Sequence, residues 1–338
     1  MTKITKNIDT AVKEIIKGNV IALPTETVYG LCANALNINA VLKIFKIKNR
    51  PKFNPLIVHL YNIEQSVNYV KEIPSDAIKL MEKFIPGPIT FVLKKKRIIP
   101  DIVTAGLDTV AIRFPSKKVF RDILRILQLP IAAPSANIFG KISPVDAKDV
   151  YNELRGKINY IFDGGKCEIG IESTVVGFQN DEVYILRHGY ITKEKIEKTI
   201  GKKVTQKQNV ISQRKTKILS PGMLLSHYSP DTPLYITKNI SAFEKIKNEK
   251  EKINIQLKRG EIIKTEIYSH DIGLLNLSIY GSYEKAASNL FSNLRKLDKK
   301  GYKIIVTELL ENRNLGTAIN ERLIKASLGT IEINQKSF

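Results

Sequence analysis

Short apolar segments that end in polar turns alternate with amphipathic segments from residue 1 to about residue 205. The strand-like segments are VIALPTETVYG, PLIVHL, ITFVLKK, TVAIRFPS, PIAAPSAN, YIFDGG, ESTVVGF and VYILRHG. Between them, NAVLKIFKIKN, SDAIKLMEKFI and KVFRDILRILQ carry apolar residues near positions i, i+3 and i+4, the spacing of a helix with one buried face. Because some strands are apolar throughout and others only on one face, the pattern predicts a twisted mixed sheet covered by helices.

A second α/β pattern begins at residue 234. Its predicted strands are PLYIT and KIIVTEL, and its predicted helices are SAFEKIKNEKEK, YEKAASNLFSNLRKLDKKG and AINERLIKAS. This alternation favours a small doubly wound domain. Residues 206–219, between the two patterns, are polar and basic, as linkers are. We therefore expect a first domain over 1–205, a linker over 206–233 and a smaller second domain over 234–338.

The predicted linker ends in an unusual segment, SPGMLLSHYSP, at residues 220–230. It contains a histidine, a tyrosine and two prolines, whereas a simple spacer is built from small or uniformly polar residues. This segment is therefore predicted to have a function of its own.

Composition restricts the class of protein. The chain has 338 residues, of which 43% are hydrophobic, enough for two domains with ordinary cores. No apolar run approaches the ~20 residues of a membrane-spanning helix, and the N-terminal segment, which contains Asp9 and Glu14, is typical of an amphipathic helix and not of a signal peptide. We expect a soluble, cytoplasmic protein without membrane contact. Cys32 and Cys167 are predicted to be buried thiols, and with four histidines they supply no zinc cluster.

The net charge of +21 indicates polyanionic partners: nucleic acid, nucleotides or an acidic protein. Charge alone does not separate a triphosphate pocket from an RNA-binding face, because lysines scattered over a surface are mostly solvated. The sequence contains no GxxxxGK[ST] loop and no GxGxxG after a strand. A bound nucleotide would therefore be held by side chains and scattered backbone amides.

Polar clusters stand at the ends of predicted strands, where α/β proteins bind ligands. Thr25, Glu26, Thr27 and Tyr29 follow Pro24, and one alternative for this string is a helix N-cap. That alternative accounts for one threonine and leaves the rest of the string unexplained.

Two further clusters contain groups that bind anions. Lys48 and Arg50 precede Pro51 and form a plausible fork for phosphate oxygens. Ser135 and Asn137 follow an apolar strand and offer a hydroxyl and an amide, although turn chemistry explains them equally well.

Two arginines raise a separate question, because Arg113 and Arg187 each end an otherwise apolar strand. Each must therefore find an anion or lie at the end of the sheet. Ser173 stands in a similar position in IEST, whereas His59 alone is more typical of a satisfied, half-buried imidazole.

The clusters, taken in order, resemble the YrdC-like family. The matching segments are PTETVYGL, KNRP with NPLIVH, PGPIT, TVAIRFP, AAPSAN, DGG, GIESTVV and ILRHG. SPGM with HYSP, and NLGTAINERLIKAS near the end, resemble the family's long two-domain form, the threonylcarbamoyl-adenylate synthases. The resemblance implies a twisted mixed-sheet first domain with a basic cavity, a structured linker that closes over it, and a smaller Rossmann-like second domain.

The resemblance also implies an activity. It implies a nucleotidyltransferase that condenses L-threonine, bicarbonate and ATP into threonylcarbamoyl-AMP and releases pyrophosphate. A separate transferase would then modify tRNAs reading ANN codons to contain threonylcarbamoyladenosine, and direct binding of tRNA by this chain would be weak. Mg²⁺ would accompany ATP without a site fixed by protein side chains, and no organic cofactor is implied.

The resemblance assigns roles to individual residues. The catalytic positions are Lys48 and Arg50. The ATP-binding positions are Arg50, Asn54, Thr109, Ser135, Asn137, Ser143, Arg187, His227 and Tyr228, and the L-threonine-binding positions are Thr27, His59, Arg113, Ala133 and Ser173. The chain departs from the family's usual residues at Cys32, Ile85, His188 and Ser226, none of which is assigned to a ligand.

Two other functions remain as alternatives. A carbamoyl-adenylate-forming domain, as in hydrogenase maturation factors, would be accompanied by acylphosphatase-like and zinc-finger parts, which two cysteines cannot supply. An RNA-binding module that uses the basic cavity without catalysis agrees with the charge of +21, but tryptophan is absent and aromatic platforms for base stacking are not obvious.

Overall fold

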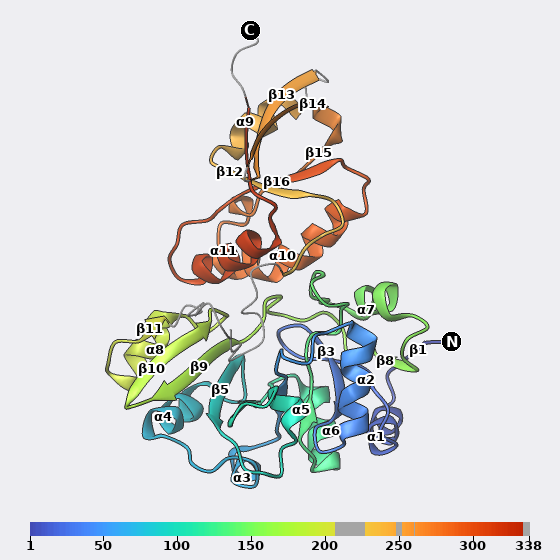
Figure 1. Ribbon diagram of the computed structural model, residues 1–338, viewed down its shortest axis with the longest axis vertical. Helices are drawn as coiled ribbons and strands as arrows, with labels where there is room; N and C mark the ends of the chain where they lie inside the picture. Colours follow the sequence, from blue (N-terminus) through green and yellow to red (C-terminus); the bar gives the residue numbers. More distant parts are fainter. Residues whose placement is uncertain (207–226, 248–251, 260, 334–338) are drawn as a thin grey trace. The chain divides into compact units, whose positions relative to one another are not determined.

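The computed structural model describes residues 1–206, 227–247, 252–259 and 261–333. The chain divides into two compact units: residues 1–139 with 143–224, and residues 140–142 with 225–338. Each unit contains its own β-sheet with helices packed on it (Figure 1). The predictions of two α/β domains and of a mixed sheet in the first are confirmed, and the exact limits of the domains and linker stay a prediction.

The sheet of the first unit has eleven strands in the described part of the chain, in the order β1-β8-β2-β3-β7-β4-β6-β5-β9-β10-β11. The strands are β1 (Lys3–Thr5), β2 (Ile21–Pro24), β3 (Tyr29–Asn34), β4 (Ile57–His59), β5 (Ile89–Lys94), β6 (Thr109–Arg113), β7 (Ile131–Ala132), β8 (Tyr160–Phe162), β9 (Thr174–Gln179), β10 (Glu182–Arg187) and β11 (Thr205–Gln206). The sheet is mixed: β4 is parallel to β6, and β5 is antiparallel to β6 but parallel to β9.

Helices cover this sheet (Figure 1). They are α1 (Ile8–Ile16), α2 (Ile38–Lys48), α3 (Ile63–Ser66), α4 (Ser75–Phe84), α5 (Asp101–Thr104), α6 (Lys118–Leu127), α7 (Ala147–Leu154) and α8 (Lys193–Ile200). Helices α1 and α6 lie next to each other and bury Ile15 and Phe120 in one cluster with Ile21 of β2 and Ile131 of β7. Each such side chain contributes about 1.5–3 kcal/mol when it is fully buried, so this cluster anchors the strands whose ends carry the predicted site.

The string PTETVYG forms a hairpin loop between two strands. β2 ends at Pro24, residues 25–28 turn the chain, and β3 begins at Tyr29, which is the register partner of Pro24. The hydroxyl oxygen of Thr25 accepts hydrogen bonds from the backbone N–H groups of Thr27 and Val28, at 3.1 and 3.2 Å. The helix N-cap alternative is therefore wrong, because the loop closes on its own threonine and the chain returns as a strand.

The second unit contains a six-stranded sheet in the order β14-β13-β17-β12-β16-β15. Its elements are β12 (Leu234–Thr237), α9 (Ile240–Lys247), β13 (Lys252–Arg259), β14 (Glu261–Tyr268), β15 (Ile272–Leu275), α10 (Tyr283–Asp298), β16 (Ile304–Glu308), α11 (Leu315–Ala326) and β17 (Thr330–Ile333). β15, β16, β12 and β17 are parallel, as a doubly wound domain requires, and α10 lies beside α11 (Figure 1). The antiparallel hairpin β13–β14 was not predicted from the sequence.

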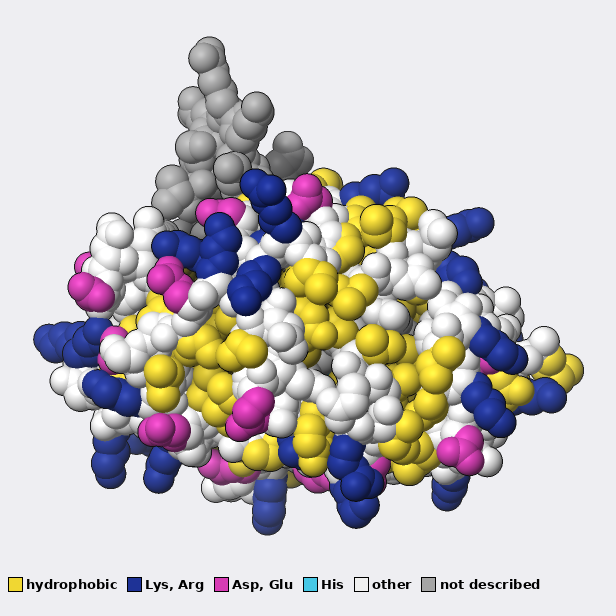
Figure 2. All heavy atoms as spheres, turned by 90° about the horizontal axis from the view of Figure 1, so that it is seen from below, with side chains coloured by type: hydrophobic (Ala, Val, Ile, Leu, Met, Phe, Trp, Pro, Cys, Tyr) yellow, Lys and Arg dark blue, Asp and Glu magenta, His cyan; other side chains and the backbone are white. Residues whose placement is uncertain are grey.

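Three general expectations can be compared with the structure. Cys32 and Cys167 are free thiols and are buried, as predicted. Among the described residues, no helix combines the length and the apolar character of a membrane span. On the face shown in Figure 2, Lys and Arg side chains are interspersed with Asp and Glu, with hydrophobic side chains between them. The positive charge on this face is thus spread out and not gathered into one patch.

Candidate functional site

Three strands of the first sheet bring polar side chains side by side. His59 and Arg113 are the last residues of the parallel strands β4 and β6, and they are register partners. Thr90, near the start of the antiparallel strand β5, pairs with Arg113 from the other side. All three side chains are buried. The register therefore aligns an imidazole, a guanidinium and a hydroxyl across neighbouring strands.

Ser173 and Arg187 lie at the same edge of the sheet. The hydroxyl oxygens of Thr90 and Ser173 are 2.8 Å apart and share a hydrogen bond. The Nη2 of Arg187 donates to the backbone oxygen and the hydroxyl of Ser173, at 2.9 and 3.1 Å. Ser143 is tied to the residue before Ser173, since its hydroxyl donates to Glu172 Oε1 at 2.6 Å. The structure thus brings Ser143, Ser173 and Arg187 together.

The guanidinium of Arg113 is held by the β2–β3 loop. Its Nη2 donates to Oε1 of Glu26 at 2.7 Å and to the hydroxyl of Thr27 at 2.8 Å. The side chains of Arg113 and Glu26 form a buried ion pair, only 5% and 7% exposed. The Nε of Arg113 is buried and has no hydrogen-bond partner among the described residues. An ionised donor left without an acceptor in a buried position is suited to an anionic ligand.

Lys48 lies at the C-terminal end of α2, where Asn49 turns the chain with a positive φ of 50°. Its Nζ donates to the backbone oxygens of Ser135 and Asn137, at 2.6 and 2.5 Å. Burial, and secondly the neighbouring charge of Arg50, hold the pKa of the Lys48 ammonium well below its usual value. The structure therefore joins Lys48 to the predicted serine and asparagine.

Arg50 folds back onto the turn that follows it. Its Nη2 donates to Oδ1 of Asn54 at 2.6 Å and to the backbone oxygen of Pro55 at 2.9 Å. Asn54 is completely buried, and its Nδ2 has no hydrogen-bond partner in the part of the chain that the structure describes. The amide of Asn54 is thus a second buried donor that a ligand oxygen would satisfy.

His59 is an uncharged imidazole at neutral pH. Burial, and secondly the positive charge of Arg113, lower the pKa of His59 to about 3. Its ring packs on Phe120, with ring centroids 5.3 Å apart. The Nδ1 of His59 is buried without a partner within the described ranges. A neutral imidazole nitrogen can donate or accept a hydrogen bond, depending on the tautomer.

Thr109 lies at the other end of β6 from Arg113. Because the two residues are four apart on one strand, their side chains point to the same side of the sheet. Thr109 lines a pocket of about 350 Å³ together with Val92, Tyr184 and Leu186. It does not contact the cluster around Arg113, but it lies on the same strand face.

Ala133 contributes backbone groups. It follows β7, and its N–H donates to the backbone oxygen of Ile57 at 3.0 Å. A Cβ atom added at Gly30 would lie 3.1 Å from the Cβ of Ala133. The backbone at Ala133 is therefore fixed between β4 and β3.

Gly189 packs directly on the backbone of the segment that carries Ser173. A Cβ atom at position 189 would lie 2.3 Å from the backbone N of Thr174 and 2.4 Å from the carbonyl carbon of Ser173. These distances are too short for any side chain. The absence of a side chain at Gly189 therefore allows Ser173 to lie where Thr90 and Arg187 hold it.

His227 and Tyr228 belong to the second unit. The N–H of His227 donates to the backbone oxygen of Lys325 at 3.1 Å. Tyr228 has a positive φ of 67°, stacks on Phe291 with ring centroids 5.5 Å apart, and lies 5.8 Å from the guanidinium of Arg322. This end of the predicted linker is anchored in the second unit, and its residues 207–226 lie outside the described residues.

Three residues that contact the site were not assigned from the sequence: Glu26, Thr90 and Glu172. Each of them bonds directly to an assigned residue. All three lie inside segments that carry the resemblance, PTET, PGPIT and GIEST. The available signal was therefore their place in these segments.

The composition of the site bears on metal binding. Within the described residues, no group of three or more His, Cys, Asp or Glu side chains could hold a metal ion. Apart from Ala133, the assigned side chains are cations, hydroxyls, amides and the imidazoles of His59 and His227. They suit anionic ligands, and any divalent ion here would need most of its oxygen ligands from elsewhere.

Comparisons with known proteins agree with this picture. Residues 13–189 match the family model Sua5_yciO_yrdC, described as telomere recombination, and residues 191–327 match the model described as the C-terminal domain of threonylcarbamoyl-AMP synthase. The threonylcarbamoyl-AMP synthase of Pyrococcus abyssi is 38% identical, with 93% of this chain and 92% of the relative covered. That of Bacillus subtilis is 40% identical, with 93% and 91% covered. The crystal structure of P. abyssi Sua5 complexed with L-threonine matches with a TM-score of 0.83 at 36% identity, covering 98% of this chain and 99% of that one.

Proposed function

This chain belongs to the threonylcarbamoyl-AMP synthase family, and we infer that it condenses L-threonine, bicarbonate and ATP into threonylcarbamoyl-AMP with release of pyrophosphate. The reaction makes it a nucleotidyltransferase, because the adenylyl group of ATP is transferred. The product serves the threonylcarbamoyladenosine modification of tRNAs reading ANN codons, through a separate transferase. The chain would act in the cytoplasm and would bind tRNA weakly at most.

One observation carries this proposal: polar nitrogens are buried without partners at assigned positions. The Nδ2 of Asn54, the Nδ1 of His59 and the Nε of Arg113 all lack a hydrogen-bond partner among the described residues. An unsatisfied buried group costs about 1–3 kcal/mol. Ligand atoms that bond to these nitrogens would recover that free energy, so the three residues support a site for polar substrates at the predicted place.

L-Threonine would bind at the edge formed by β4 and β6. Arg113 would bind the carboxylate, because a guanidinium N–H forms strong, directed hydrogen bonds to carboxylate oxygens. Thr27, His59, Ser173 and the backbone at Ala133 would surround the rest of the amino acid. The P. abyssi relative that matches this structure was solved with L-threonine, which supports an amino-acid site in this fold.

ATP would bind beside the amino acid. Lys48, Arg50 and Arg187 would hold the phosphates, together with Asn54, Ser135, Asn137 and Ser143. Thr109 would lie near the adenosine, because the pocket that it lines has apolar walls from Val92 and Leu186. His227 and Tyr228 would reach the nucleotide from the linker, which would close over the site.

The reaction needs these residue types because both reactants are anions. The amine of threonine combines with bicarbonate to give a carbamate and water, and a carbamate oxygen then attacks the α-phosphorus while pyrophosphate leaves. Fixed cations and donors reduce the repulsion and stabilise the charge that develops in the transition state. Burial and the charge of Arg50 lower the pKa of the Lys48 amine, and the negative charge of bound phosphates would raise this pKa again, because an opposite charge favours the protonated form.

We propose that Mg²⁺ enters with ATP. Mg²⁺ is usually bound through substrate phosphates, water and one or two carboxylates, so the ion would reach the site on the triphosphate. When bound, the ion would neutralise part of the phosphate charge, while Lys48 and Arg50 position the phosphates.

The decisive experiment is product analysis with labelled bicarbonate, ATP and a panel of amino acids. We expect pyrophosphate release that requires both threonine and bicarbonate, and a labelled adduct of AMP. Pyrophosphate release that is independent of threonine would overturn the proposal. Salt-sensitive tRNA binding without any pyrophosphate release would instead support the RNA-binding module.

A further inference from the structure

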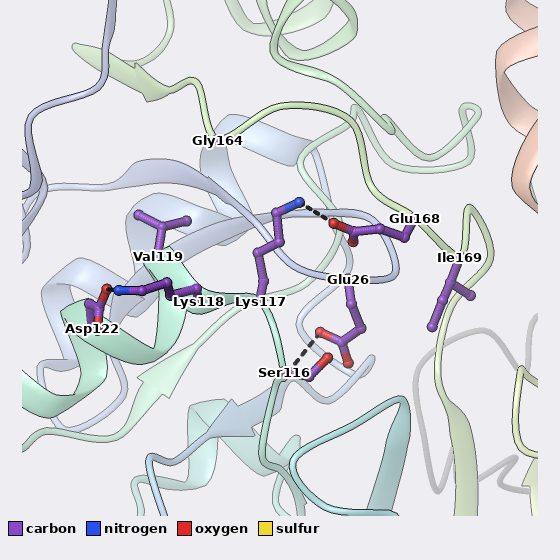
Figure 3. A pocket seen from close by; sticks show the side chains of 9 residues that line it. All are labelled: Glu26, Ser116, Lys117, Lys118, Val119, Asp122, Gly164, Glu168 and Ile169. Carbon is purple, nitrogen blue, oxygen red and sulfur yellow. Dashed lines mark hydrogen bonds and ion pairs between the residues drawn. The ribbon is translucent and has the colours of Figure 1, made fainter.

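Glu26 lies between Arg113 and a pocket on the surface of the first unit. Figure 3 shows this pocket, which has a volume of about 590 Å³ and is lined by Glu26, Ser116, Lys117 and Glu168 among others. The Oε1 of Glu26 accepts from the Nη2 of Arg113, and its Oε2 accepts from the backbone N–H of Ser116 at 3.1 Å. Both carboxylate oxygens of Glu26 therefore accept a hydrogen bond, one from Arg113 and the other from the backbone of Ser116 beside the pocket.

The backbone that carries Glu26 is also fixed. The carbonyl oxygen of Glu26 accepts from the N–H of Ile169 at 2.9 Å, and that of Thr27 accepts from the N–H of Gly170 at 3.2 Å. The hydroxyls of Thr25 and Thr27 are bonded to each other at 2.8 Å. The backbone at Glu26 is thus fixed, and a rotation of its carboxylate away from Arg113 would break the hydrogen bonds from Arg113 and from the Ser116 N–H.

These contacts occupy one nitrogen of the Arg113 guanidinium. The Nη2 of Arg113 has two hydrogens and makes two hydrogen bonds, to Glu26 and to Thr27. Its Nε–H remains for an acceptor that the described residues do not supply. A flexible arginine carries about 2 kcal/mol of rotamer entropy, and a side chain that is fixed in advance does not lose this freedom on binding.

We propose that Glu26 is a positioning residue for L-threonine: it fixes the direction of Arg113 for the substrate carboxylate and supplies the buried counter-charge when no substrate is bound. This inference rests on the proposed function, in which Arg113 binds that carboxylate. The hydrogen bond from the Ser116 N–H to Glu26 belongs to this arrangement, because it limits how far the Glu26 carboxylate reaches toward Arg113.

The test changes the reach and the charge of the Glu26 side chain one at a time. Glu26→Asp keeps the charge but is one methylene too short to bridge Arg113 and the Ser116 N–H, whereas Glu26→Gln keeps the length and loses the charge. We expect both to raise KM for threonine about tenfold, which is about 1.4 kcal/mol, with KM for ATP within about twofold. Glu168→Asp and Glu168→Gln are matched controls: they change a carboxylate of the same pocket that pairs with Lys117 and is 61% exposed, and should leave both constants unchanged.

A second pair of variants tests the anchor without touching either charged group. Ser116→Pro removes the backbone N–H that binds Glu26, and Ser116→Ala keeps it. We expect Ser116→Pro alone to raise KM for threonine, with an unchanged unfolding temperature as the measure that the fold is intact.

The outcomes separate the two proposals. If the wild-type protein releases no pyrophosphate with threonine, the proposed function fails. If the wild type is active and folded Glu26→Asp and Ser116→Pro variants keep its threonine KM, the role of Glu26 is overturned while the proposed function stands.

Discussion

The two ends of the candidate site hold their cations by different means. Arg113 donates to the carboxylate of Glu26, so a negative charge lies beside its guanidinium. Lys48 donates to the backbone oxygens of Ser135 and Asn137, which are neutral acceptors. A neutral oxygen fixes the position of a cation but leaves its charge, whereas a carboxylate fixes the position and cancels much of the charge.

The difference corresponds to the two proposed ligands. Threonine has a single carboxylate, for which direction matters more than charge, and a guanidinium beside Glu26 can still offer an aligned N–H. A triphosphate has several negative charges, for which uncancelled positive charge contributes more, since two charges interact more strongly in a buried site than in water. One site can thus contain a cation that orients a carboxylate and a cation that neutralises phosphate charge.

The largest expected effect comes from breaking the ion pair. Arg113→Met should leave Glu26 buried and unpaired and cost about 3–5 kcal/mol of unfolding free energy. Adding Glu26→Leu should restore most of this stability without restoring the use of threonine. Denaturant unfolding and steady-state kinetics on both variants test this. Normal threonine kinetics in the double variant would contradict the proposed role of Arg113.

At the phosphate end, Lys48→Ala and Arg50→Ala should each lower the rate of adduct formation about 100-fold or more. The reason is that each removes a buried cation that faces the developing charge. Lys46→Ala, at an exposed position on the same helix, is the matched control and should have the wild-type rate. Full activity in both site variants would show that the phosphates bind elsewhere.

A substitution at His227, in the predicted linker, should affect only the binding of ATP. His227→Ala is expected to raise KM for ATP about tenfold, about 1.4 kcal/mol, and to leave KM for threonine unchanged. His270→Ala serves as control, because its side chain is 64% exposed in the same unit. If KM for threonine rose instead, the linker would belong to the other end of the site.

The smallest effect at neutral pH concerns His59. The pKa of His59 is lowered to about 3, whereas an unfolded chain has a histidine pKa of about 6.5. Between these values the unfolded state binds a proton that the folded state does not. The unfolding free energy should therefore be unaffected above about pH 6.5 and decrease as the pH falls below it, by up to about 1.4 kcal/mol per pH unit.

Urea unfolding of the wild type and of His59→Gln between about pH 7 and pH 4 measures this contribution. The variant should lose less stability on acidification. Parallel curves would contradict the prediction, because they would mean that His59 binds its proton as readily in the folded protein as in the unfolded chain.

Local patterns predicted the helices well and the strand pairing poorly. The spacing of apolar residues predicted helices over 75–85 and 118–128, and the structure has Ser75–Phe84 and Lys118–Leu127. The pattern of residues 20–30 predicts one strand-like run, whereas the structure has a hairpin that turns at Thr25. β13 and β14 pair with each other and β13 also pairs with β17, and such partners are not visible in the pattern of a single segment.

The same limit applies to the contacts within the site, which join distant parts of the chain. The resemblance named Arg113, Lys48 and Ser173, because each lies in a recognisable segment. It did not reveal that Glu26 pairs with Arg113, or that Thr90 pairs with Ser173, since these partners are 87 and 83 residues apart along the chain. Strand register and loop packing create these contacts, and the spacing of residues within one segment does not predict them.

Gly189 shows that this site can be damaged by adding atoms as well as by removing them. An alanine at this position would push into the backbone between Ser173 and Thr174, although residue 189 itself offers no group to either substrate. Random mutagenesis should therefore find inactive variants in which Gly189 is replaced while every charged side chain of the site is intact. Their defect would be steric, and a screen confined to polar side chains would overlook it.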